Sequence, residues 1–112
     1  MQVYDTANRL ASEIKQSEEY INYKMAKQAI ELNQDLKKKL QEFEKERYEE
    51  QLGVMQTGKQ DEEKMKKVQE LYAELMEQEE AKKFFDAELK FNVLIGDVNR
   101  IIAESVKDVL GY

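Results

Sequence analysis

The chain has 112 residues and a formal net charge of -6 at pH 7, so DNA and RNA are not expected as direct partners, because binding them rests on cation–phosphate contacts. It contains no histidine, cysteine, proline or tryptophan, which removes Ser–His and Cys–His catalysis, the common zinc sites and disulfides. Apolar residues make up 41% and charged residues 38% of the chain, a balance typical of long helices that pack against other helices.

At this length we expect one domain spanning residues 1–112. No apolar run approaches the roughly 20 residues that a transmembrane helix needs. The first residues lack the basic segment and apolar core of a signal peptide. Because cysteine is absent as well, we expect a cytoplasmic protein that does not enter a membrane.

Apolar residues recur at helical spacing from the start of the chain. Val3, Ala7, Leu10 and Ile14 are separated by four, three and four residues, which predicts a first helix. Ser17 can cap a second helix, because its hydroxyl can accept a hydrogen bond from a free backbone N–H. Glu18 and Glu19 follow it, and negative charges are favourable at the positive N-terminal end of a helix. We expect the inner face of this second helix to carry four apolar residues: Ile21, Met25, Ala29 and Leu32. Asn33 either ends the second helix or caps the third.

The third helix should end in a tight turn. Its apolar positions are Leu36, Leu40, Phe43, Tyr48, Leu52 and Met55. Gly53 is a weak stop signal and Thr57-Gly58 is a stronger one. Asp61 can then cap the next helix, so the sequence predicts an αα-hairpin with its bend near Gly58.

The last fifty residues before the C-terminal glycine contain one interior glycine, Gly96, and no proline. A helix with Leu71 and Leu75 on its apolar face leads to a polar stretch at residues 77–81, where the pattern allows either a break or a continuous helix. A long C-terminal helix then runs to Leu110 and ends at Gly111. We therefore predict an all-α fold, a four- or five-helix bundle with a long C-terminal helix.

Catalytic, cofactor-binding and metal-binding residues are not predicted. Carboxylates are plentiful, as in Glu42, Glu46 and Glu50, but they alternate with lysines on a face that should be solvated. A solvated glutamate is a weak acid or base at neutral pH. The lysine runs at 37–39 and 82–83 are surrounded by acids and lack interleaved aromatic residues. These patterns favour charged helix faces over an enzyme or an RNA-binding surface.

The segment from Phe91 to Ala103 is apolar around most of its circumference. Eight of its 13 residues are apolar, and only Asp97 and Arg100 are charged, whereas a surface helix needs an apolar stripe of about 100°. Two interpretations are open: the central helix of a monomeric bundle, or a helix with one flank in a homodimer or partner interface. We favour the interface, and its candidate residues are Phe84, Phe91, Leu94, Ile95, Val98, Ile101 and Ile102. Gly96 costs about 1 kcal/mol relative to alanine in a helix, which a closely approaching second backbone would explain.

Four stretches carry a resemblance to a known family. They are YDTANRLASEIKQSEEY near the start, the Asn33-Gln34-Asp35 break, the Gly58 hairpin, and FNVLIGDVNRIIAESVKDVLG at the end. Together they resemble the YlbF/YmcA family, particularly its YheA-like branch, over essentially the whole chain. The resemblance rests on the order and spacing of helices more than on individual residues.

The resemblance implies a small cytoplasmic bacterial helical bundle that forms dimers. Some relatives act in a multiprotein complex that influences mRNA processing and, through it, competence, sporulation and biofilm development. Iron–sulfur clusters are associated with cysteines in those relatives, and this chain has no cysteine, so no cofactor is carried over. No catalytic residue is implied.

The functional hypothesis is a non-enzymatic regulatory or adaptor protein that acts through protein–protein contacts, as a homodimer and with other cytoplasmic regulatory proteins. One alternative is a chaperone-like helical hairpin that holds clients with exposed residues near Gly58: Leu52, Val54, Met55 and Met65. Another is a small-ligand-binding helical bundle that uses buried carboxylates.

Overall fold

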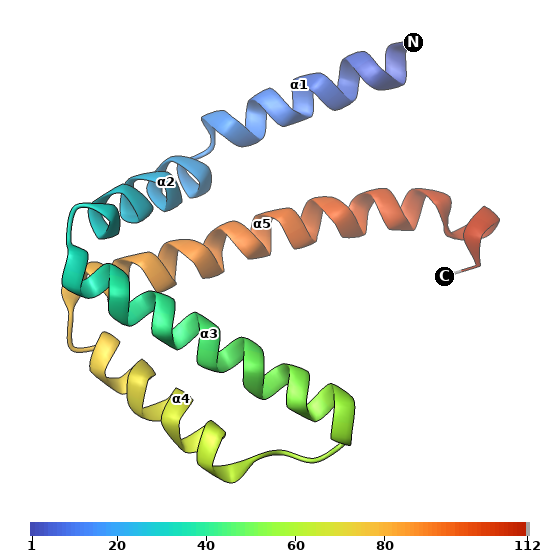
Figure 1. The fold of residues 1–112 in the computed structure, drawn as a ribbon. Helices are drawn as coiled ribbons and strands as arrows, with labels where there is room; N and C mark the ends of the chain where they lie inside the picture. The colour runs from blue at the N-terminus through green and yellow to red at the C-terminus, as the bar shows by residue number, and fades with distance from the viewer. Residues whose placement is uncertain (112) are drawn as a thin grey trace. The chain divides into compact units, whose positions relative to one another are not determined.

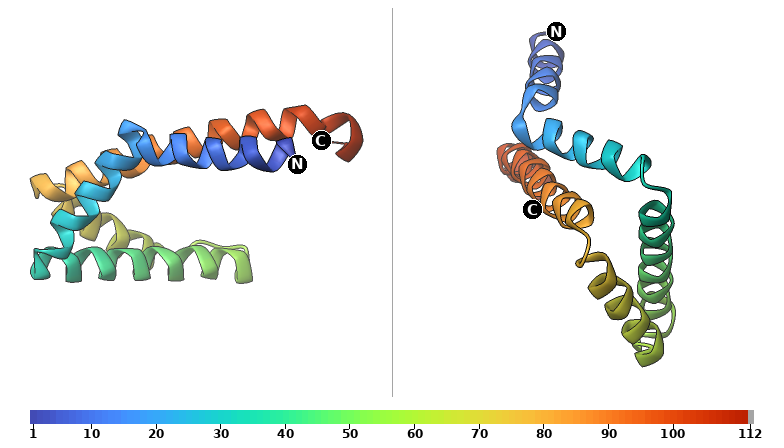
Figure 2. Two further views of the ribbon diagram at one scale, coloured as in Figure 1. Left: turned by 90° about the horizontal axis from the view of Figure 1, so that it is seen from above. Right: turned by 90° about the vertical axis from the view of Figure 1, so that its left-hand side faces the viewer.

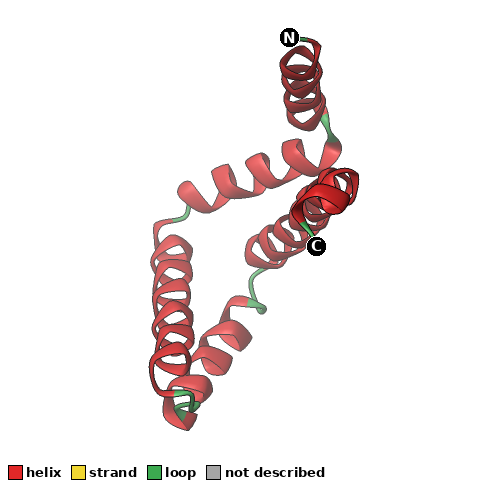
Figure 3. Ribbon diagram, turned by 90° about the vertical axis from the view of Figure 1, so that its right-hand side faces the viewer, coloured by secondary structure: helices red, strands yellow, loops and turns green. Residues whose placement is uncertain are grey.

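The computed structural model describes residues 1–111 and contains five helices in that range (Figure 1). They are α1 (Gln2–Gln16), α2 (Glu18–Glu31), α3 (Gln34–Thr57), α4 (Glu62–Leu75) and α5 (Glu79–Leu110). Short turns join them, and the described part of the chain has no strand (Figure 3). The predictions of an all-α fold and of a long C-terminal helix are confirmed.

Side-chain caps set the helix boundaries near Ser17 and Asn33. The Ser17 hydroxyl accepts a hydrogen bond from the Tyr20 backbone N–H at 3.2 Å, and its extended backbone separates α1 from α2. The Asn33 side-chain oxygen accepts from the Leu36 backbone N–H at 3.2 Å. Each cap satisfies an N–H group that has no partner within its helix, so local chemistry fixes these ends.

The bend of the αα-hairpin lies where the sequence predicts it. Gly58 adopts a left-handed conformation with φ of 72°, and its backbone N–H donates to the carbonyl oxygen of Val54 at 2.8 Å. Asp61 caps α4 by accepting from the backbone N–H groups of Glu63 and Lys64 at 3.0 and 3.3 Å. Gly53, the weaker stop signal, lies inside α3.

A short turn separates α4 from α5. The backbone N–H of Glu77 donates to the carbonyl oxygen of Glu74 and that of Gln78 to Leu75, at 3.2 and 2.9 Å. These bonds reach back three residues, so the last turn tightens before the chain leaves the helix. The alternative of one continuous helix through residues 77–81 is therefore wrong.

The described chain divides into two compact units, residues 26–84 and residues 1–25 with 85–111. Residues 26–84 hold most of the buried apolar side chains, and α3 and α4 pack side by side there (Figure 2). The rings of Phe43 and Tyr72 lie 5.9 Å apart across this pair. The buried apolar residues of this unit are Ile30, Leu36, Leu40, Phe43, Leu71, Leu75, Ala81 and Phe84.

Ion pairs along the hairpin link the charged flanks of α3 and α4. Lys64 lies 3.6 Å from a carboxylate oxygen of Glu49, and Lys67 lies 3.8 and 3.4 Å from those of Glu42 and Glu46. These side chains are mostly half exposed, and such pairs contribute little to stability. Burial of the apolar side chains therefore carries the packing of α3 on α4.

The other unit, described over residues 1–25 and 85–111, has one buried residue, Ala87. Helix α1 contributes none. A helix normally gains most of its stability by burying an apolar face. This unit therefore leaves its apolar residues largely uncovered, in contrast to the hairpin.

The predicted inner face of α2 is wrong. Ile21, Met25 and Leu32 are exposed and Ala29 is half-buried, whereas Ile30 is the buried residue of α2. The cause is that α2 carries apolar side chains on two opposite sides, and the side with Tyr23 and Ile30 is the one that packs. Spacing alone does not distinguish two such stripes.

Candidate interaction surface

The second half of α5 has apolar side chains on several sides, and many of them are exposed. Ile101 is 66% exposed and Ile102 is 53% exposed. Four more residues of the helix are similarly open to solvent: Leu89, Val93, Val109 and Leu110. The interpretation of α5 as a helix buried all round inside a monomer is therefore wrong for this structure.

The seven residues predicted for an interface fall into three groups. Phe84 is 3% exposed and belongs to the buried core of residues 26–84. Ile101 and Ile102 are exposed. The other four are half-buried: Phe91, Leu94, Ile95 and Val98. Six of the seven thus keep surface that a partner could contact, and their role in an interface stays a prediction.

An aromatic cluster holds the middle of α5 against α2. The ring of Phe91 lies 6.1 Å from that of Tyr20 and 5.5 Å from that of Tyr23, both tilted. The Tyr23 hydroxyl donates to a carboxylate oxygen of Glu88 at 3.3 Å. Sequence reasoning missed Tyr20 and Tyr23, although two tyrosines three residues apart on one helix side are the signal that could have found them.

Helix α1 carries a second uncovered set of apolar residues. Val3 and Tyr4 are exposed, as is Ala7, while Leu10 and Ile14 are half-buried. The ribbon of α1 runs apart from that of α5 (Figure 1; right-hand view of Figure 2). We call Val3, Ala7, Leu10 and Ile14 the N-terminal stripe, and Phe91, Ile95, Val98, Ile102 and Val109 the C-terminal stripe.

Charged residues on α5 pair along the helix. Lys90 lies 3.1 Å from Asp86, Arg100 lies 3.2 Å from Asp97, and Lys107 lies 3.2 Å from Glu104. All six side chains are at least half exposed, so each pair contributes tenths of a kcal/mol, roughly 0.2–0.5. Each pair joins one acid to one base, so the pairs add no net charge to α5 and contribute little to its stability.

Gly96 is not approached by another part of the described chain. Apart from its chain neighbours and the backbone of its own helix, no atom lies within 4 Å of the position where a Cβ would stand. A close approach of another backbone from the same chain therefore does not account for glycine at this position.

The hairpin tip exposes a smaller apolar group. Met55 is 82% exposed, Leu52 and Tyr48 are also exposed, and Val54 and Met65 are half-buried. Apart from Tyr48, which lies further back in α3, these residues lie close to the Gly58 turn. They form the surface that a client-binding hairpin would use.

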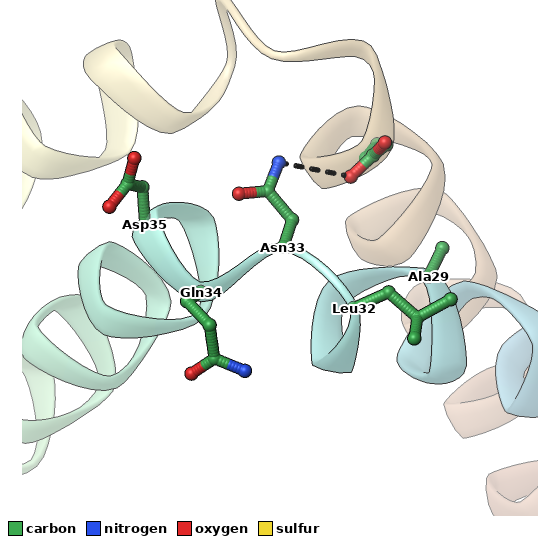
Figure 4. Close-up of a pocket in the computed structure, with 6 residues that line it drawn as sticks. Ala29, Leu32, Asn33, Gln34 and Asp35 are labelled. Carbon is green, nitrogen blue, oxygen red and sulfur yellow. Dashed lines mark hydrogen bonds between the residues drawn. The ribbon is translucent and has the colours of Figure 1, made fainter.

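A shallow polar hollow lies at the corner between α2 and α3 (Figure 4). The Asn33 amide donates to a carboxylate oxygen of Glu80 at 3.4 Å across it. Its other lining residues are Ala29, Leu32, Gln34 and Asp35. Small-molecule sites are concave and mostly apolar, whereas this hollow is open and polar, so it does not define a binding site.

Candidate metal-binding clusters and buried polar side chains are absent from the part of the chain that the structure describes. No group of three or more acidic side chains is placed to hold a metal ion, and no polar or charged residue is buried. None of the described helices has the length and hydropathy required to cross a bilayer. The exposed apolar side chains of α1 and α5 are therefore the feature that most needs a functional explanation.

Comparison with known proteins identifies relatives over nearly the whole chain. Residues 3–107 match the family described as "Control of competence regulator ComK, YlbF/YmcA". A UPF0342 protein of Alkalihalophilus pseudofirmus is 34% identical over 109 residues, which cover 97% of this chain and 92% of the relative. A UPF0342 protein of Clostridium novyi is 31% identical over 108 residues, 96% of this chain and 95% of the relative. One of Desulfitobacterium hafniense is 30% identical over 110 residues, 98% and 89% of the two chains.

Proposed function

This chain belongs to the YlbF/YmcA family, and we propose that it is a non-enzymatic regulatory or adaptor protein that acts through protein–protein contacts and forms a homodimer. The family description, control of a competence regulator, is consistent with a regulatory role. The observation that carries the proposal is the exposed apolar surface of α5, including Ile101 and Ile102. Large exposed apolar patches on soluble proteins mark interaction sites.

The proposed contact uses α5 as the anchor of the interface. Ile101, Ile102 and the half-buried residues beside them supply apolar area, and burying it away from water favours association. The paired charges at Asp97–Arg100 and Glu104–Lys107 border this area. Charged rims set the orientation and specificity of a contact more than its affinity.

The pathway follows from the family resemblance. It implies action in the cytoplasm on a regulatory route that includes mRNA processing and leads to competence, sporulation and biofilm development. The absence of cysteine leaves no thiolate to bind an iron–sulfur cluster. We therefore propose that contact between proteins, without a bound cofactor, transmits the regulatory effect.

A sedimentation-velocity series from low to high micromolar concentration tests the self-association. We expect species heavier than the 13.3 kDa chain at the upper concentrations. Ile101→Glu should raise the dissociation constant at least about tenfold, equivalent to about 1.4 kcal/mol, because it places a charge in the buried contact. Gln69→Glu, an exposed change on α4 with the same added charge, is the matched control. A clean 13.3 kDa species at high micromolar concentration would defeat the proposal.

The exposed side chains at the hairpin tip favour a second candidate function, a chaperone-like hold on clients. Met55 at 82% exposure is the central residue of that surface, and methionine adapts well to varied partners. Suppression of client aggregation by the chain, and its loss in Met55→Ser, would support this function. A chain that leaves client aggregation unchanged at a tenfold excess does not have it.

A further inference from the structure

We propose that the N-terminal stripe of α1 and the C-terminal stripe of α5 bind the same two stripes of a second copy of this chain. Four helices, two from each copy, then form one shared bundle. This inference rests on the proposed self-association and adds α1 to the interface. The apolar face of α1 is then covered only when the partner copy is bound.

Helix α1 needs a cover that the chain does not supply. It spans 15 residues and none of them is buried, and isolated helices shorter than about 12–15 residues are marginal in water. Val3 and Ala7 of the N-terminal stripe are exposed, and so is the neighbouring Tyr4. A helix of this length persists when its apolar face packs against other helices.

The two stripes have the spacing that helix pairs use. The N-terminal stripe steps by four, three and four residues, and the C-terminal stripe by four, three, four and seven. With the seven-residue step counted as two, the steps average about 3.7 and 3.6 residues, close to the 3.5-residue repeat by which apolar residues stay on the seam between packed helices. Tyr20, in the first turn of α2 just after α1 ends, contacts Phe91 of α5. The chain therefore runs toward this contact along α1 and away from it along α5, in the opposite directions that neighbours in an antiparallel bundle have.

Closing α1 onto α5 within one chain would not cover α5. The C-terminal stripe lies on one side of the helix at 100° per residue, with Ile101 on one flank and Leu110 on the other. Both flanking residues are exposed. One neighbour covers one side of a helix, whereas each helix of a four-helix bundle contacts two.

The charge of the two helices favours a second copy as the occupant. Residues 1–16 carry Asp5 and Glu13 against Arg9 and Lys15, a net charge of 0. Residues 91–111 carry three acids and two bases, a net charge of -1: Asp97, Glu104 and Asp108 against Arg100 and Lys107. Two copies of a chain with net charge -6 repel least where these helices meet.

The exposed area is large enough for a stable dimer. Six apolar side chains on the two stripes or their flanks are 53% to 82% exposed. At on the order of 100 Å² each they offer about 600 Å² per chain, or about 1,200 Å² for the pair, the lower end of the range for standard protein–protein interfaces. The six residues are Val3, Tyr4, Ile101, Ile102, Val109 and Leu110.

Site-directed cross-linking tests the arrangement directly, because the chain has no cysteine of its own. Full-length Leu10→Cys, labelled with ¹⁵N, is mixed with unlabelled Ile102→Cys and treated with a short bis-maleimide. We expect cross-linked pairs of one labelled and one unlabelled chain, identified by mass spectrometry. Ser12→Cys in place of Leu10→Cys is the matched control, because residue 12 lies on the opposite side of α1 from the N-terminal stripe.

The affinity of the dimer provides the second measurement. Leu10→Asp should raise the dissociation constant at least tenfold in sedimentation velocity, and Ser12→Asp should change it less than twofold. Since no residue of α1 is buried within the chain, neither change disturbs a core. Circular dichroism of the monomers should therefore show equal helix content for the two variants.

The outcomes separate this inference from the function it rests on. A dimer in which Leu10→Cys cross-links no better than Ser12→Cys, and whose affinity Leu10→Asp leaves unchanged, overturns the role of α1 and leaves the proposed function standing. Cross-linking of a Leu10→Cys, Ile102→Cys double variant only within one chain also overturns it. The absence of any dimer defeats both.

Discussion

Shortening Leu75 to alanine tests the packing of the α3–α4 hairpin. Leu75 is 0% exposed and is the largest fully buried side chain among the described residues. A buried Leu→Ala change costs about 2–5 kcal/mol through lost transfer energy and the cavity left behind. Because Leu75 lies at the end of α4, next to the turn at residues 76–78, its neighbours can partly collapse. We therefore expect a loss of about 2–3 kcal/mol in the free energy of unfolding.

Urea unfolding followed by circular dichroism at one fixed protein concentration measures this loss. The concentration is held constant because self-association stabilises the native state by mass action. Met55→Ala is the matched control, since Met55 lies in the same hairpin and is 82% exposed; its effect should stay within about 0.5 kcal/mol. A loss below about 1 kcal/mol for Leu75→Ala, or an equal loss for both variants, would refute the assignment of the hairpin core.

Three further changes test the turn and its helices by the same unfolding measurement. Gly58→Ala should destabilise the chain by about 1–2 kcal/mol, because residue 58 has a φ of 72°; an unchanged midpoint would contradict the left-handed turn. Asp61→Ala should cost about 1 kcal/mol through loss of the α4 cap, while Asp61→Asn, which keeps the acceptor oxygen, should cost clearly less. Gly53→Ala should raise the free energy of unfolding by about 0.5–1 kcal/mol, because Gly53 lies inside α3 and a Cβ there meets no atom within 4 Å; a loss would mean that the position is packed.

Helix boundaries were predictable where a single side chain determines them. Ser17, Asn33 and Asp61 accept hydrogen bonds from backbone N–H groups two or three residues ahead, so their chemistry is readable from the sequence. Gly58 is readable for the same reason, because its left-handed conformation is local. The turn at residues 76–78 contains neither glycine nor proline, so no local signal chose between a break and a continuous helix.

The candidate surface was only partly predictable because tertiary contacts decide which apolar side of a helix is covered. The sequence identified α5 as too apolar for a surface helix, and exposed Ile101 and Ile102 agree with that reasoning. It did not separate Phe84, which the hairpin unit buries, from the residues that remain open. The exposure of α1 was missed as well, because a helix with ordinary apolar spacing is expected to find cover within its own chain.

The uncovered helix α1 has a consequence for synthesis on the ribosome. It emerges before α5, but under the proposed arrangement its final contacts need residues of α5 and a second finished polypeptide. At about 5–20 residues per second, translation of the rest of the chain takes roughly 5–20 s. During that interval the nascent segment depends for its solubility on four charged residues spaced between its apolar positions: Asp5, Arg9, Glu13 and Lys15. The same charges oppose its association with nascent chains on neighbouring ribosomes of the same mRNA.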